Sequence, residues 1–247
     1  MTEPTDDLGD RVDTVAKRIA YLDLLRDGDP RPPSEIVDEL EDSRSTVTRA
    51  LEELQEADLV EQTADGYVAT LAGAMAGSQY RRYRRGVEAI GRLEEPLEAL
   101  PPSAMPPVEV FVGAEAVREK PASAITPAVR EATSCVAYLP RPADGPVVQA
   151  LADGDVERTR EATVVLDSSL WSVLDRDRPA VLENLTEAAD VTRASEDGLP
   201  YAVVVLGDGL DSTVSVVFYD DSGVTGAVTT DSNEAVQWAR DELGSLD

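Results

Sequence analysis

The sequence contains no histidine and a single cysteine, Cys135. Without histidine the chain cannot build a Ser-His-Asp triad or a Cys-His pair, and it lacks the commonest metal ligand. One cysteine cannot form an internal disulfide bond. Because Cys135 lies in the apolar run SCVAYLP, we expect a buried, inert thiol in preference to a redox sensor. We expect no enzyme activity, cofactor or metal; Asp167 is the one acid that an enzyme hypothesis would test.

Lysine is almost absent. Only two of the 22 basic residues are lysines, and 49 acidic residues bring the formal net charge to −27. This balance predicts a solvated acidic surface. With so little lysine it resembles the proteins of salt-loving archaea, in which concentrated intracellular salt screens self-repulsion. A nucleic-acid partner is therefore not excluded, provided that acids are kept away from the contacting face.

Long apolar runs are missing as well. None approaches the roughly 18 residues that a membrane-spanning helix requires, and the opening residues MTEPTDDLGD are acidic where a secretion signal is basic. We expect a soluble, cytoplasmic protein without membrane contact. The 247 residues suffice for two modest domains, and an aromatic content of 4% predicts an aliphatic core.

The first part of the chain has the pattern of three helices and a hairpin. Apolar residues recur at helical spacing over 11–26, 34–40 and 43–57. Two short apolar runs then flank the turn residues Ala64-Asp65-Gly66. This order of elements predicts a winged helix-turn-helix domain over residues 11–72.

The third helix of such a domain lies in the major groove, where its first residues meet base edges. With Val47, Ala50 and Leu51 turned inward, no acid faces outward before Glu52. Arginine pairs with guanine edges, and hydroxyls reach bases or phosphates. We therefore predict DNA contacts from Ser43, Arg44, Ser45, Thr46, Thr48 and Arg49. The alternative is a solvated polar helix in a winged helix that binds protein.

Two further segments complete the predicted DNA interface. The hairpin would form a wing around Gly66 and Tyr67, but it has no basic residue. The segment QYRRYRR places four arginines within 81–85, so we expect phosphate contacts from Arg81 and Arg82. The alternative is that this cluster is solvated or pairs with the acids of the chain itself.

Residues 73–100 predict a linker helix that also dimerises the protein. Its apolar positions are Met75, Val87, Ile90, Leu93 and Leu97. A homodimer would match operators built from two half-sites. The proline pairs of PPSAMPP, residues 101–107, then predict a domain boundary.

The remaining residues, 108–247, predict an α/β sheet domain that ends in an antiparallel meander. Aliphatic runs typical of strands occupy 108–113, 135–140, 162–167, 201–207, 213–220 and 224–230. Helical segments occupy 122–133, 145–152, 168–190 (one helix or two) and 232–243. In the last helix, Ala235, Trp238 and Leu243 are the expected inward residues. The whole chain is thus a two-domain protein of the α+β or α/β class.

One stretch of this domain could bind a small effector. In LDSSLWSVL a strand end leads through Ser168 into a helix that carries Trp171, and Tyr201 opens a later strand. Ligands of α/β sheets gather at the carboxyl ends of strands. The three residues are our candidates for an effector pocket. The alternative is that Ser168 caps the helix and Trp171 fills the core.

The order of these motifs resembles archaeal winged-helix regulators with a FilR-type C-terminal domain. The resemblance rests on DSRSTVTRALEELQEADLVE, DGYVATLAG, QYRRY, VFVGAEAV, VVLDSSLWSVL, DGLPYAVVVLGD and the C-terminal VVFYDDSGVTGAVTTDSNEAVQWARDEL. It covers the chain from about residue 11. Glu41-Asp42 is a departure, because such proteins usually have a glycine and an apolar residue there.

The resemblance implies a homodimeric, sequence-specific DNA-binding transcriptional regulator. Its C-terminal domain would sense a small molecule or a protein partner and modulate binding to double-stranded DNA. The alternative is a winged-helix adaptor that binds protein and reads no DNA sequence. The operator, the effector and the sign of regulation do not follow from the sequence.

Overall fold

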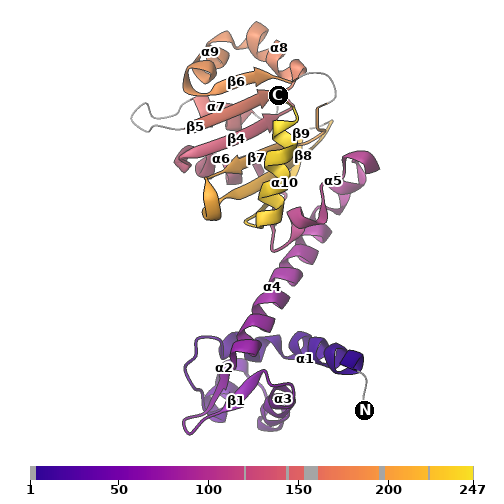
Figure 1. Cartoon of the computed structure of the whole chain (residues 1–247), viewed down its shortest axis with the longest axis vertical. Coiled ribbons are helices and arrows are strands. Elements are labelled where there is room, and N and C mark those ends of the chain that lie inside the picture. Colours follow the sequence, from indigo (N-terminus) through magenta and orange to yellow (C-terminus); the bar gives the residue numbers. More distant parts are fainter. Residues whose placement is uncertain are drawn as a thin grey trace. The chain divides into compact units, whose positions relative to one another are not determined.

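The computed structural model describes residues 4–119, 121–142, 145–152, 161–194, 198–221 and 223–246. The chain folds into two compact units, of which the first ends at Tyr83 and the second begins at Arg84 (Figure 1). The sequence places the domain boundary at the proline pairs of 101–107. The structure instead assigns the segment from Arg84 onward to the C-terminal unit, because Ala89 and Leu93 are buried in its core.

The N-terminal unit contains the three predicted helices and the hairpin. They are α1 (Pro4–Leu24), α2 (Pro33–Leu40), α3 (Arg44–Glu56), β1 (Val60–Gln62) and β2 (Tyr67–Ala69). Pro33 occupies the first turn of α2, where its missing N–H costs nothing. Ser43 caps α3 by accepting a 3.2 Å hydrogen bond from the Thr46 amide. The aliphatic core includes Leu22, Leu25, Ile36, Leu51, Leu54 and Leu59, each at most 2% exposed.

Helix α4 (Leu71–Arg92) packs onto the N-terminal unit through glycines. A Cβ atom on Gly73 would lie 1.9 Å from the Leu59 carbonyl oxygen, and one on Gly77 would lie 3.6 Å from the Leu22 Cβ. Only a residue without a side chain allows the approach at Gly73. Beyond α4 come α5 (Glu94–Glu98) and the 3₁₀ turns Pro102–Ala104 and Val108–Phe111.

Within the residues that the structure describes, the C-terminal unit is built on a seven-stranded mixed sheet. Its strands are β3 (Glu115–Val117), β4 (Ser134–Leu139), β5 (Glu161–Leu166), β6 (Asp190–Arg193), β7 (Ala202–Leu206), β8 (Thr213–Asp220) and β9 (Gly223–Thr230). The strand order is β3-β9-β8-β7-β4-β5-β6. Strands β4, β5 and β6 are parallel, whereas β7, β8 and β9 form the predicted antiparallel meander.

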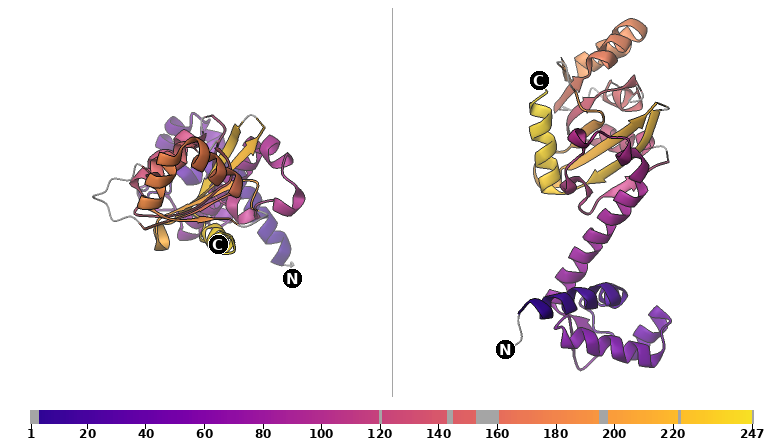
Figure 2. Two further views of the ribbon diagram at one scale, coloured as in Figure 1. Left: turned by 90° about the horizontal axis from the view of Figure 1, so that it is seen from above. Right: turned by 90° about the vertical axis from the view of Figure 1, so that its right-hand side faces the viewer.

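Two hydrophobic clusters cover the two faces of this sheet (Figure 2). One face is covered by α6 (Pro121–Glu131), α7 (Gly145–Ala152), α8 (Ser168–Asp177) and α9 (Pro179–Ala188). The other is covered by α10 (Asn233–Gly244), the turn Val108–Phe111 and the end of α4. Cys135 is buried in the first cluster, as expected. The unit is therefore three-layered.

One local prediction was wrong. Residues 108–113 do not form a strand, because Pro107 accepts from the Val110 amide in a 3₁₀ turn and Gly113 takes φ of 66°. Residues 168–190 form two helices, α8 and α9, which is one of the two alternatives that the sequence left open; residue 190 begins the short strand β6, which the sequence did not predict. In the described part of the chain, no helix combines the length and apolarity needed to span a bilayer.

Candidate nucleic-acid interface

The outward face of α3 carries the side chains predicted to meet DNA. Val47, Ala50, Leu51 and Leu54 are at most 2% exposed, so the opposite face is open. Ser43, Arg44, Ser45, Thr48 and Arg49 are exposed there, and Thr46 is half-buried. The structure thus brings all six predicted residues of this segment onto one helix start.

The hydroxyl groups of this face already make hydrogen bonds within the start of the helix. Ser43 Oγ lies 3.0 Å from Ser45 Oγ and 2.8 Å from Thr46 Oγ1. Thr48 Oγ1 donates a 3.0 Å hydrogen bond to the Arg44 carbonyl oxygen. A hydroxyl has one proton and two lone pairs, so these side chains keep acceptor capacity while their orientations are restricted.

The two arginines of α3 differ in their surroundings. Arg44 makes no salt bridge to the residues that the structure describes. Arg49 is 78% exposed, and its Nε lies 3.0 Å from Glu53 Oε1. The other oxygen of Glu53, Oε2, lies 2.9 Å from Arg18 Nε of α1. The hydrogen bond from Arg18, with a smaller contribution from Arg49, lowers the pKa of the Glu53 carboxyl.

Sequence reasoning missed this cluster of Arg18, Arg49 and Glu53. The spacing of four residues between Arg49 and Glu53 on a helix could have indicated their pair. Arg18 is 35 residues from Glu53 and belongs to another helix, so no local sequence pattern predicts the ion pair between them.

The two acids before α3 are arranged differently from each other. Glu41 takes a left-handed conformation with φ of 55°. Asp42 is half-buried and is bonded to Tyr21 of α1. The acid nearest the start of α3 is therefore engaged within the protein.

The hairpin is tied to the segment before α2. Arg31 and Tyr67 exchange two backbone hydrogen bonds of 2.9 and 2.8 Å. Gly66 has φ of 144°, and a Cβ atom there would lie 2.3 Å from the Arg31 carbonyl carbon. The Tyr67 side chain packs partly against the core. Both residues hold the hairpin in place, and nothing basic joins them within β1 or β2.

The arginine cluster of α4 is partly used inside the molecule. Arg81 forms an ion pair with Asp23 and is only 25% exposed. Arg82 is half-buried, and Arg84 Nε lies 3.6 Å from Glu88 Oε1. Of the two phosphate contacts predicted here, Arg81 thus matches the alternative of pairing with the protein's own acids.

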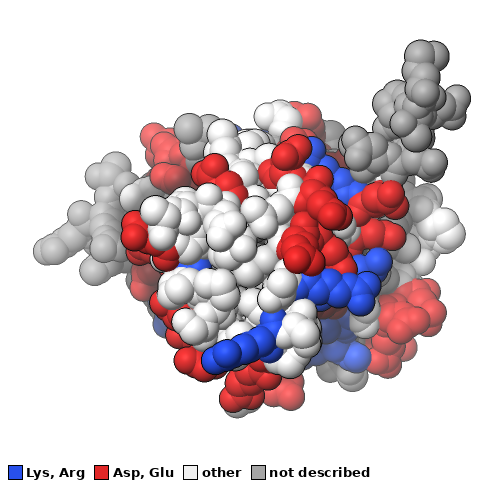
Figure 3. Space-filling model, turned by 90° about the horizontal axis from the view of Figure 1, so that it is seen from below, with Lys and Arg blue, Asp and Glu red and all other residues white. Residues whose placement is uncertain are grey.

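Figure 3 shows the end of the N-terminal unit on which α3 and the hairpin lie. The surface nearest the viewer is largely uncharged, with separate basic side chains at its margin and a band of acids on one side. This end of the N-terminal unit therefore carries less charge at its centre than the net charge of the chain would suggest.

The predicted effector residues do not come together. Trp171 packs against the cluster under α6 to α9, whereas Tyr201 is buried on the other sheet face, with its ring 6.1 Å from that of Phe218. Asp167, rather than Ser168, caps α8, through a 2.7 Å bond from the Ser169 amide. Ser168 Oγ instead donates to the Ala194 carbonyl oxygen and accepts from Arg193 Nε.

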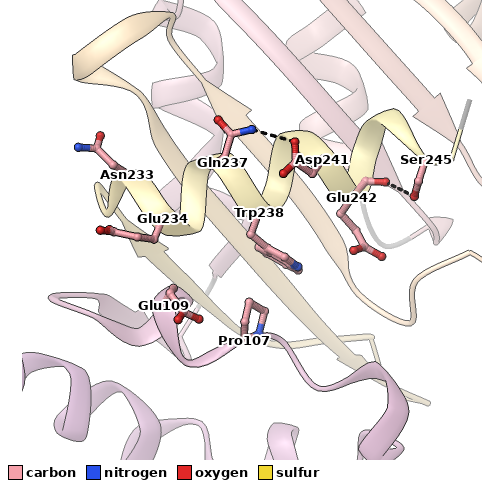
Figure 4. A pocket seen from close by; sticks show the side chains of 9 residues that line it. All are labelled: Pro107, Glu109, Asn233, Glu234, Gln237, Trp238, Asp241, Glu242 and Ser245. Atoms are coloured by element: carbon pink, nitrogen blue, oxygen red, sulfur yellow. Dashed lines mark hydrogen bonds between the residues drawn. The ribbon is translucent and has the colours of Figure 1, made fainter.

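An open groove of about 870 Å³ lies elsewhere, along α10 (Figure 4). Its lining comes from α10 and from Pro107 and Glu109 of the opposite segment. Trp238, expected to point inward, is only partly buried and faces this groove, whereas Ala235 and Leu243 are buried. None of the three predicted effector residues lines it.

Two family models match the chain. One, described as HVO_A0261 N-terminal domain, matches residues 7–92. The other, described as methanogenesis regulatory protein FilR1, middle domain, matches residues 119–245, which is more than half of the chain. The chain belongs to the FilR1 middle-domain family. The resemblance to archaeal regulators with a FilR-type domain is thereby confirmed, and no curated protein matches the sequence.

Solved structures resemble this FilR1-type chain only distantly. TrmBL2, described as an archaeal chromatin protein with a novel mode of DNA binding, is 14% identical, covers 91% of this chain and 89% of its own, and has a TM-score of 0.37. Polyphosphate kinase from Porphyromonas gingivalis is 8% identical over 61% and 28% of the two chains, with a TM-score of 0.40. An O-methyltransferase family protein from Burkholderia thailandensis is 13% identical over 79% and 65%, with a TM-score of 0.30. At these TM-scores the likenesses carry no argument.

Proposed function

We propose that the chain is a cytoplasmic, sequence-specific DNA-binding transcriptional regulator. Its N-terminal unit is a winged helix-turn-helix, and α3 enters the major groove of double-stranded DNA. The observation that carries the proposal is the outward face of α3, which presents Arg44, Arg49 and several hydroxyls and no acid over residues 43–51, in a chain of net charge −27. Membership of a family named for a regulatory protein supports it.

The electrostatics favour contacts through bases over contacts through many phosphates. A protein that neutralises few phosphates gains little from counterion release, and concentrated salt reduces that gain further. Arg44, Arg49 and the hydroxyls of Ser43, Ser45 and Thr48 have the chemistry of base and phosphate contacts at close range. Shape fit and base contacts would therefore supply most of the affinity.

The regulator acts as a homodimer in this proposal. Helix α4 leaves large apolar side chains exposed to between 41% and 78%, at Leu71, Met75 and Tyr83 in the N-terminal unit and at Val87 and Ile90 in the C-terminal unit. Leu93 and Leu97, which the sequence assigned to the same apolar face, pack in the core of the C-terminal unit. A run of exposed apolar residues along one helix is typical of an interaction surface, and a second copy would supply the second recognition helix for a two-part operator.

The C-terminal unit modulates DNA binding in response to an effector or a partner. Its membership of the FilR1 middle-domain family supports a regulatory role. Trp171 and Tyr201 pack against opposite faces of the sheet, so we do not include the predicted effector pocket in this proposal.

The test is genome-wide occupancy of the tagged full-length protein in a salt-adapted host, for the wild type and for Arg44→Ala combined with Arg49→Ala. Shared-motif peaks that disappear in the double variant are the expected result. Unchanged peaks in the variant, or flat occupancy in both proteins, would overturn the proposal and favour the protein-binding adaptor. Thermal unfolding of both proteins controls for loss of fold.

A further inference from the structure

The guanidinium of Arg49 is held from one side only. Its Nε donates to Glu53 Oε1 at 3.0 Å, and the described residues give it no other salt bridge. Arginine has five N–H donors in a fixed planar fork. When Nε is held by Glu53, the guanidinium edge that carries the two terminal amino groups points away from Glu53. The Arg49 side chain is 78% exposed, so this edge is open to a partner.

Glu53 is itself anchored by the neighbouring helix. Arg18 of α1 donates from Nε to Glu53 Oε2 at 2.9 Å, and the Arg18 side chain is only 19% exposed. Glu53 is 30% exposed, and the hydrogen bond from Arg18 lowers the pKa of its carboxyl, so that it stays charged to a lower pH than an ordinary glutamate. One carboxylate thus joins a half-buried arginine of α1 to an exposed arginine of α3, with one oxygen for each.

We propose that Arg49 recognises a guanine in the major groove and that Glu53, held by Arg18, is the residue that positions it. This inference rests on the proposed DNA-binding function. Two parallel N–H donors of arginine match O6 and N7 of guanine, the commonest specific contact in the major groove. A carboxylate that fixes Nε restricts the rotation of the guanidinium and so reduces the entropy lost when that contact forms.

Glu53 has a second effect on selectivity. Its negative charge offsets that of Arg49, so that Arg49 attracts any nearby phosphate less strongly. A phosphate contact carries no sequence information. Removing the charge of Glu53 should therefore strengthen binding to unrelated DNA while it weakens the preference for guanine at one position.

The experiment is selection from random double-stranded DNA by the full-length protein in concentrated KCl, followed by affinity measurements on the selected site and on sites changed at single positions. The variants are Arg49→Lys, which keeps the charge but loses the planar fork, and Glu53→Gln. Glu52→Gln is the matched control, because it removes the same charge from an exposed neighbour with no salt bridge in the described structure. Arg18→Gln removes the anchor alone, and thermal unfolding accompanies each variant.

The expected result is that the selected site contains a guanine whose replacement weakens binding by the wild type about tenfold. The same replacement should hardly weaken binding by Arg49→Lys or Glu53→Gln. Arg18→Gln should show an intermediate loss at the same position, and Glu52→Gln none. A Glu53→Gln protein that keeps the full preference, or an Arg49-dependent position that is not guanine, would overturn the inference. If the wild type selects no motif at all, the proposed function itself fails, and the two failures are thus distinguished.

Discussion

The Tyr21 hydroxyl donates a hydrogen bond of 2.5 Å to Asp42 Oδ2, across the junction between α1 and the start of α3. Asp42 directly precedes the cap residue Ser43, where an outward carboxylate would repel phosphates. Burial of Tyr21, and next the hydrogen bond to Asp42, raise the pKa of Tyr21 to about 12. A core tyrosine therefore holds the acid nearest the proposed interface.

This bond predicts sensitivity to alkali. Because the pKa of Tyr21 is about 12 in the folded protein and near 10 in the unfolded chain, its contribution to stability is complete below pH 10 and is lost as the pH rises toward 12. Urea unfolding between pH 8 and pH 12 should show this fall in the free energy of unfolding, and the fall should be smaller in Tyr21→Phe. Burial also raises the pKa of Tyr201 to about 12, so Tyr201 adds to the same loss of stability between pH 10 and pH 12. Equal pH dependence in Tyr21→Phe and wild type would contradict the assignment.

Glu41 predicts a stabilising substitution. A non-glycine residue at φ of 55° is strained, so Glu41→Gly should raise the free energy of unfolding by about 0.5–1 kcal/mol. Glu39→Gly, two residues earlier and within α2, should lower it by about 0.5 kcal/mol because glycine is a poor helix former. Urea unfolding at neutral pH measures both. Equal losses in the two variants would show that the turn carries no strain.

Two glycines of α4 predict opposite outcomes of the same substitution. Gly73→Ala should lower the free energy of unfolding by about 2 kcal/mol or more, because the new methyl group would meet the Leu59 carbonyl oxygen. Gly91→Ala adds its methyl group to open space and should raise stability by up to about 1 kcal/mol. Thermal unfolding of the two variants is sufficient. A gain at both positions would mean that α4 does not pack closely on Leu59.

The exposed residues of α4 predict a dimer that charge can break. Val87→Arg combined with Ile90→Arg should shift the protein to monomers in sedimentation experiments, and should weaken binding to a two-part operator at least tenfold. Glu88→Arg, on another side of the helix, should leave the dimer intact, since its exposed pair with Arg84 contributes little. A wild-type protein that stays monomeric with and without DNA would refute this role of α4.

The outward face of α3 was predictable because helical spacing fixes it. Val47, Ala50, Leu51 and Leu54 define the buried side, and the remaining side chains must face out. The same logic predicted β4, β5, β7, β8 and β9, whose aliphatic runs are long enough to stand out. The helical spacing and the aliphatic runs are both patterns of neighbouring residues, so the sequence alone reveals them.

The misses have non-local causes. Strands β3 and β6 have three and four residues and are recognisable only by their partners β9 and β5. The link between Arg18 and Glu53 joins two helices. Tyr201 packs on the same sheet face as Val203 and Val205, whereas α8 places Trp171 against the other face, so residues that the sequence grouped lie on opposite sides of the sheet.

The strand order β3-β9-β8-β7-β4-β5-β6 leaves the two shortest strands at the two ends of the sheet. Each carries charge there, at Glu115 on one end and at Asp190 and Arg193 on the other. An open sheet edge is a template on which another chain can add a strand, and short, charged edges are a poor template. The long aliphatic strands β7 and β8 lie in the interior of the sheet. The order of the strands therefore disfavours fibre-like self-association of this unit, because only short, charged strands lie at the two edges of the sheet.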